Sequence, residues 1–120
     1  LLAARLTAEH DHPCDALPAI LVVFRSQPEA GPSPLREESA HAAVSAWNTC
    51  RASAIPDDKK QDLAGQLVQD APRLYAHGGE PRGARAFFQS VSAQGAVEME
   101  GQYKKHLQHI AADAKAGRKK

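Results

Sequence analysis

At 120 residues the chain is one domain by length, large enough to bury a core without a covalent staple. Fifteen Lys and Arg against fourteen Asp and Glu give a net charge of +1, which by itself favours no class of partner. Two cysteines exclude a disulfide-rich framework and favour a reducing compartment, and no apolar run approaches the length of a membrane span. We therefore expect a cytoplasmic protein with no membrane partner.

Alanine is abundant, β-branched residues are sparse, and no alternating apolar and polar stretch is long enough for a strand, so the sequence predicts an all-α fold. A first helix is expected over residues 1–10. Asp15 is expected to cap a second helix that reaches Phe24 and tolerates Pro18 in its first turn. The nearly continuous apolar surface of this helix predicts the most buried element.

Residues 27–34 contain three prolines and a glycine, which predict a surface loop. Ser33 and Pro34 then have the residue types of an N-cap and a first helical position, so a third helix is expected to begin there. Val44 and Trp47 define its buried face.

A fourth helix is expected from Asp57, with Pro72 ending or kinking it and Tyr75 in a short turn before the next glycines. The paired aromatics Phe87 and Phe88 then mark a fifth helix. The predicted core positions of the fourth helix are Leu63, Leu67 and Val68.

A last helix is predicted by apolar residues spaced four, four, three and four apart from Met99. The elements together predict a compact bundle of five or six helices. Residues 1–116 are expected to form its single domain and residues 117–120 a basic tail. The seam of the last helix is Met99, Tyr103, Leu107, Ile110 and Ala114.

Positive charge gathers toward the C-terminus, where residues 103–120 hold six cations against Asp113 alone. This distribution is typical of a neutral body that presents a basic edge to a polyanion, or of a solvated tail. Arg82 and Arg85 lie at a helix start, whose unpaired amides favour an anion. The alternative is that these arginines pair with acidic neighbours or face solvent.

The sequence offers no metal or catalytic motif. His10, His12 and Cys14 form an H-x-H-x-C cluster, but no second pair stands at zinc-site spacing, so a solvated turn is the favoured interpretation. Cys14 and Cys50 are expected to be small buried or half-buried residues, and no nucleophile has a base encoded beside it. We expect no enzyme activity, no metal and no cofactor; a metal-linked regulatory domain ranks last among the alternatives.

The aromatic rings are expected in the core, with only Tyr75 and Tyr103 able to lie at its rim. A platform of exposed rings for base stacking is therefore not supported. If nucleic acid is bound, the sequence predicts contacts from Arg and Lys to the phosphate backbone with little base readout.

The segment 58–68, which contains Leu-Ala and Leu-Val pairs, and the later segment 85–91, which begins Arg-Ala-Phe-Phe, resemble the small helical subunit of CRISPR effector complexes of type III and, more loosely, type IV. Arg82 departs from the Thr or Ser usual there. The resemblance implies a non-catalytic bundle that stacks with copies of itself along larger RNA-binding backbone subunits. It also implies contact with guide RNA or target nucleic acid, with Arg85 as the carried-over position.

Six exposed cations are the candidate nucleic-acid-binding residues. The alternative function is a helical protein–protein interaction or assembly module without nucleic acid, which would use the apolar faces of the first and last helices. The candidate residues are Lys59, Lys60, Arg82, Arg85, Lys104 and Lys105.

Overall fold

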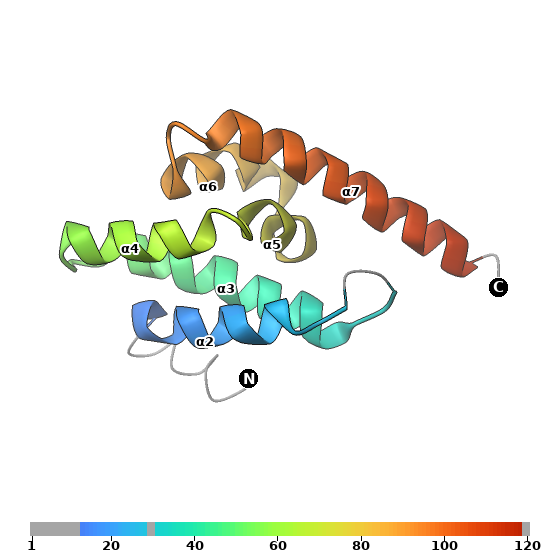
Figure 1. Cartoon of the computed structure of the whole chain (residues 1–120), viewed down its shortest axis with the longest axis horizontal. Coiled ribbons are helices and arrows are strands. Elements are labelled where there is room, and N and C mark those ends of the chain that lie inside the picture. The colour runs from blue at the N-terminus through green and yellow to red at the C-terminus, as the bar shows by residue number, and fades with distance from the viewer. Residues whose placement is uncertain (1–12, 29–30, 119–120) are drawn as a thin grey trace.

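The computed structural model describes residues 13–28 and 31–118, which form six α-helices and one 3₁₀ turn with no strand among them (Figure 1). This confirms the predicted all-α bundle. The helix expected over residues 1–10 lies outside the described residues. The elements are α2 (Pro13–Arg25), α3 (Pro34–Ala52), α4 (Asp57–Leu67), α5 (Ala71–Gly78), the turn η1 (Pro81–Gly83), α6 (Ala84–Val91) and α7 (Ala96–Arg118).

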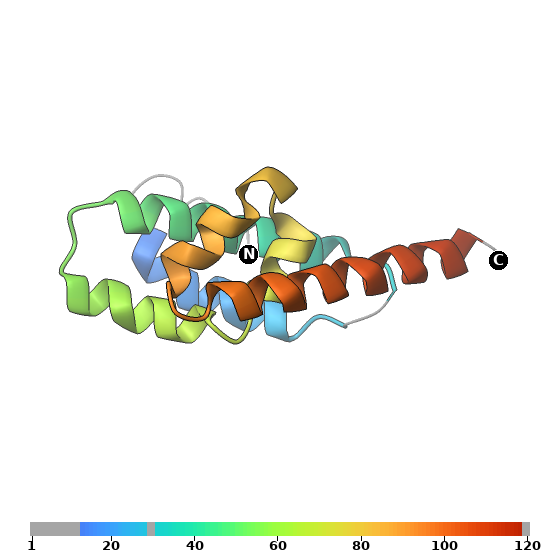
Figure 2. The same cartoon turned by 90° about the horizontal axis from the view of Figure 1, so that it is seen from above.

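The helices pack around one apolar core with α5 at its centre. Helix α2 lies against α3, α5 contacts both α3 and α7, and α6 lies along the first half of α7 (Figure 1). Figures 1 and 2 both show the second half of α7 extending beyond the other helices, and its backbone stays helical to Arg118, inside the predicted tail. The largest fully buried side chains include Phe24, Trp47, Leu67, Leu74 and Phe88.

Local signals placed the start of α3 correctly. The Ser33 side chain accepts a hydrogen bond from the Arg36 amide at 3.2 Å, and Pro34 stands at the first helical position. Proline suits that position because its missing N–H has no helical acceptor there. The loop before α3 and the buried face marked by Trp47 were also predicted correctly.

Two predictions about prolines were wrong. Helix α2 begins at Pro13, so Pro18 lies inside the helix and cannot donate to the carbonyl oxygen of Cys14. Helix α4 ends at Leu67, and Pro72 belongs to the first turn of α5. A proline fits the first turn of one helix as well as the end of another, so the residue type alone did not settle its role.

The burial of two side chains also differs from expectation. Tyr75 is in α5 rather than in a short turn, and it is buried in the core. Val68 caps the C-terminal end of α4 and is 40% exposed, so it is not a core position. Leu63 and Leu67 are buried as predicted.

The two cysteines are buried, as expected, and they are joined in a disulfide between α2 and α3. The bridge between Cys14 and Cys50 spans a sequence separation of 36. Disulfides persist in oxidising compartments, so the pairing weighs against the reducing cytoplasm expected from the cysteine count. Within the described ranges, no helix is both long and apolar enough to cross a membrane.

Replacing Phe87 by alanine should lower the free energy of unfolding by about 3 to 5 kcal/mol, because the ring is only 2% exposed and its loss leaves a cavity. Val97→Ala is the matched control, with a change within about 0.5 kcal/mol, because Val97 is 84% exposed. Urea unfolding followed by circular dichroism measures both. Equal losses in the two variants would contradict the described core.

Reduction of the disulfide should lower the free energy of unfolding by about 2 to 4 kcal/mol, because the bridge restricts the unfolded chain. Urea unfolding with and without dithiothreitol gives the difference, and a variant with Cys14→Ser and Cys50→Ser should not respond to the reductant. Two free thiols per chain in protein purified without reductant would show that the bridge does not form.

Candidate anion-binding surface on the last two helices

The glycine-rich connection between α5 and α6 is built around Tyr75. The Tyr75 hydroxyl donates to the carbonyl oxygen of Glu80 at 2.6 Å. A Cβ atom on Gly83 would lie 2.6 Å from that hydroxyl, and one on Gly79 would meet the tyrosine ring. These glycines are therefore required for close packing on a buried ring, and their presence needs no phosphate to explain it.

The arginine in the first turn of α6, Arg85, is exposed. The Arg85 Nε atom lies 3.6 Å from the Glu100 Oε1 atom, and this pair joins α6 to α7. The arginine side chain is 73% exposed, so the pair is solvated and contributes well under about 1 kcal/mol. Arg82, in the 3₁₀ turn, is also exposed. Both guanidinium groups are accessible to a ligand from solvent.

Lys104 and Lys105 are exposed on α7. Lys104 follows Glu100 by four residues, so the two side chains share one side of the helix, the side that Arg85 approaches. The structure thus brings Arg85 and Lys104 to one edge of the α6–α7 pair, with Lys105 on the adjoining side. We call these three residues the α6–α7 basic edge; Arg82 lies apart from them, in the turn before α6.

Lys59 and Lys60 lie elsewhere. The Lys59 Nζ atom lies 3.0 Å from the Asp15 Oδ1 atom of α2, and the Lys60 Nζ atom donates to the carbonyl oxygen of Arg51 at 3.1 Å. They tie the start of α4 to α2 and to the end of α3. Figures 1 and 2 show this end of α4 opposite to the projecting end of α7, so the six candidate residues do not form one surface.

All six Phe, Tyr and Trp side chains of the sequence are buried. Tyr75 and Tyr103 are each 5% exposed, and their rings contact Phe88 at centroid distances of 5.6 and 5.5 Å. Burial raises the pKa of both tyrosines. The expectation that these two could lie at the rim was wrong, while the expectation that the Phe and Trp rings lie in the core is confirmed.

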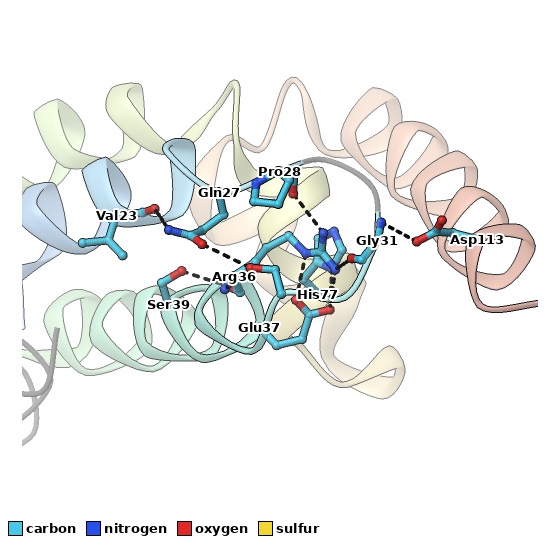
Figure 3. Close-up of polar contacts among 10 residues, drawn as sticks. Val23, Gln27, Pro28, Gly31, Arg36, Glu37, Ser39, His77 and Asp113 are labelled. Atoms are coloured by element: carbon cyan, nitrogen blue, oxygen red, sulfur yellow. Dashed lines mark hydrogen bonds and ion pairs between the residues drawn. The ribbon is translucent and has the colours of Figure 1, made fainter. Parts of the chain in front are cut away.

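Sequence reasoning missed the buried Arg36, which holds the loop between α2 and α3 (Figure 3). Its guanidinium donates to the carbonyl oxygens of Pro28 and Gly31, each at 2.9 Å, and to the Glu37 carboxylate. The Gly31 amide in turn donates to the Asp113 Oδ2 atom of α7 at 2.7 Å. From the sequence alone, an arginine that follows a proline-rich loop is expected to be exposed. No local signal therefore predicted this network.

His77 lies beside this network, and its Nδ1 atom is 3.0 Å from the Glu37 Oε1 atom (Figure 3). Burial lowers the pKa of His77, and the Glu37 carboxylate offsets only part of that effect. Burial alone would raise the pKa of Glu37, but hydrogen bonds from Arg36 and His77 outweigh it and hold that pKa below its ordinary value. Both shifts make the folded state bind protons less readily than the unfolded chain.

No group of three or more His, Cys, Asp or Glu side chains in the described part of the chain is placed to hold a metal ion. His10 and His12 of the sequence cluster lie outside the described residues. Cys14, the third member, is in the disulfide, and its sulfur is therefore not a thiolate ligand in this structure.

The two lowered pKa values predict that stability falls in acid. A histidine whose pKa is lower in the folded protein than in the unfolded chain contributes stability at pH values above its unfolded pKa, which is near 6.5. This contribution is lost as the pH falls through the pKa of the folded protein. The free energy of unfolding should therefore decrease between about pH 7 and pH 5, and His77→Gln should make that decrease smaller. The exposed His109, replaced by glutamine, is the control. Parallel pH profiles for wild type and His77→Gln would contradict the assignment.

Comparisons with known proteins found no relative of this chain. No family model matches the chain, and no curated protein or solved structure matches it either. The likeness to CRISPR small subunits therefore rests on the two short segments of the sequence alone.

Proposed function

We propose that this chain is a non-catalytic helical binding protein that contacts nucleic-acid phosphates through the α6–α7 basic edge. The observation that carries the proposal is that Arg85, Lys104 and Lys105 lie exposed along one edge of the α6–α7 pair. Both lysines belong to the most basic part of the sequence, residues 103–120. Clustered cations on one exposed edge attract a polyanion.

The surface chemistry supports backbone contact rather than base readout. Arg82, Arg85, Lys104 and Lys105 are exposed cations, and the aromatic rings that would stack on bases are all buried. The single carboxylate of the basic segment, Asp113, is engaged by the Gly31 amide. Binding of this kind depends weakly on nucleotide sequence and strongly on salt.

The narrower form of the proposal is a small subunit of an RNA-guided effector complex, bound to guide RNA or target strand and to larger backbone subunits. It is supported by the resemblance of segments 58–68 and 85–91 to that family. The arrangement of α6 is compatible with it, because Phe87 and Phe88 anchor the helix in the core while Arg85 faces outward.

The second candidate is an assembly module that binds protein without nucleic acid. The disulfide between Cys14 and Cys50 favours it, because RNA-guided complexes work in a reducing cytoplasm whereas structural disulfides belong to oxidising compartments. An assembly module should purify from the native host in a stable protein complex. That complex should survive ribonuclease treatment and charge reversal at Arg82 and Arg85.

Salt titration tests the first proposal. Affinity for a short single-stranded RNA, measured by fluorescence anisotropy, should fall steeply between about 50 and 200 mM salt. The double variant Lys104→Gln, Lys105→Gln should weaken binding and reduce the slope of log K against log salt by about 1 to 2, because up to two phosphate contacts are lost.

The matched control is the double variant Lys59→Gln, Lys60→Gln, which removes the same charge at the opposite end of the bundle. It should leave the affinity within about twofold of wild type and leave the slope unchanged. A flat salt response would contradict nucleic-acid binding. Equal effects of the two double variants would show that net charge, and not the α6–α7 basic edge, governs the interaction.

A further inference from the structure

A polar cavity of about 430 Å³ lies between α3 and the glycine-rich connection from α5 to α6. It is distinct from the α6–α7 basic edge, which contributes no residue to it. We propose that this cavity binds a small organic ammonium ion, a positively charged ligand that carries N–H donors. The exposed polar residues that line the cavity are His41, Ser45, Asn48, Thr49 and Glu80.

The charge of the lining favours a cation. Glu80 is the acidic residue of the lining, and no described lysine or arginine lines the cavity. Tyr75 holds Glu80 through its backbone carbonyl oxygen, and no hydrogen bond or ion pair with another described residue engages the exposed carboxylate. The carboxylate therefore stays available to a ligand, and a carboxylate binds a charged N–H donor more strongly than a neutral one.

His41 adds a second acceptor. Its Nδ1 atom lies 3.3 Å from the carbonyl oxygen of Gly78. A carbonyl oxygen can only accept, so Nδ1 carries the proton in this contact, and the neutral imidazole then presents Nε2 as an acceptor. An imidazole acceptor beside a free carboxylate suits a ligand that donates N–H bonds.

The polar side chains of α3 also offer mainly acceptors. The Thr49 Oγ1 atom donates to the carbonyl oxygen of Ser45 at 3.1 Å, which leaves its lone pairs free to accept. The Ser45 hydroxyl, one turn earlier, can accept as well. The Asn48 Oδ1 atom already accepts from the Arg51 Nε atom at 3.2 Å, so Asn48 supplies N–H donors to the rim. Acceptors thus dominate the side chains that a ligand would meet.

The walls of the cavity are set by packing within the protein. A Cβ atom on Gly78 would clash with the backbone of His41, and one on Gly83 would lie 2.6 Å from the Tyr75 hydroxyl, so the connection lies directly against α3 and this ring. The buried Val44 and Tyr75 side chains offer apolar contact to the body of a ligand. A preformed site lowers the entropic cost of binding.

The size and the ligand atoms of the cavity select the kind of cation. Its volume lies within the range for small-molecule sites, about 300 to 1,000 Å³. A calcium ion takes about six to eight oxygen ligands, and one carboxylate with two hydroxyls falls short of that number. An ammonium group needs only about three acceptors, which the carboxylate, the imidazole and the hydroxyls can supply.

The experiment is a titration of the full chain with butylammonium, followed by NMR of the amide groups at constant ionic strength. Tetramethylammonium is the matched probe, because it is an isomer with the same charge and no N–H group. Butylammonium should give saturable shifts at Gly78, Gly79, Gly83 and the Asn48 side chain, with a dissociation constant below about 20 mM. Tetramethylammonium should bind at least about fivefold more weakly, because it cannot donate hydrogen bonds. No saturable shifts, or equal binding of the two ions, would overturn the proposal.

Glu80→Gln should weaken butylammonium binding by about fivefold or more, because it removes the charge and keeps the backbone carbonyl oxygen that Tyr75 uses. Glu98→Gln, the matched control, removes an exposed carboxylate outside the cavity and should leave binding within about twofold. Ser45→Leu fills the cavity from an exposed position on α3 and should abolish the saturable shifts. Near-UV circular dichroism checks the folding of each variant. Equal weakening by the two glutamine variants, or undiminished binding to Ser45→Leu, would contradict the site.

Discussion

The packing of Tyr75 is the constraint on which the C-terminal half of the molecule depends. Its ring lies 4.7 Å from Phe87 and 5.7 Å from Tyr103, centroid to centroid, so one side chain of α5 fixes both α6 and α7. Its hydroxyl is satisfied by the Glu80 carbonyl oxygen, which sets the course of the chain between α5 and α6. The position of Arg85 relative to Lys104 follows from this buried cluster.

A second set of contacts controls the far part of α7. Helix α7 leaves the bundle after its first half, and the loop between α2 and α3 reaches it through the hydrogen bond from Gly31 to Asp113. The Arg36 guanidinium donates hydrogen bonds to two carbonyl oxygens of the same loop. The buried arginine thus links the start of α3, through this loop, to the projecting part of α7.

Sequence reasoning succeeded where a signal was local or strongly periodic. The cap at Ser33 and the anchor at Phe87 follow from residue type and spacing, and both are observed. It failed where tertiary contacts decide the outcome. Tyr75 is buried because it packs against three aromatic rings of other helices. Arg36 is buried because its guanidinium donates hydrogen bonds to carbonyl oxygens of the loop. The pairing of Cys14 with a cysteine on another helix likewise depends on how α2 and α3 pack, which spacing does not encode. The cations of the candidate site were identified as exposed, but their separation into two surfaces required the fold.

The central claim, phosphate contact by the α6–α7 basic edge, is tested most directly by lysine protection. The protein would be acetylated under limiting conditions with and without a short RNA, and modification at each lysine quantified by mass spectrometry. The account predicts protection of Lys104 and Lys105 and unchanged modification of Lys59 and Lys60. Uniform protection of all four lysines, or none, would contradict it.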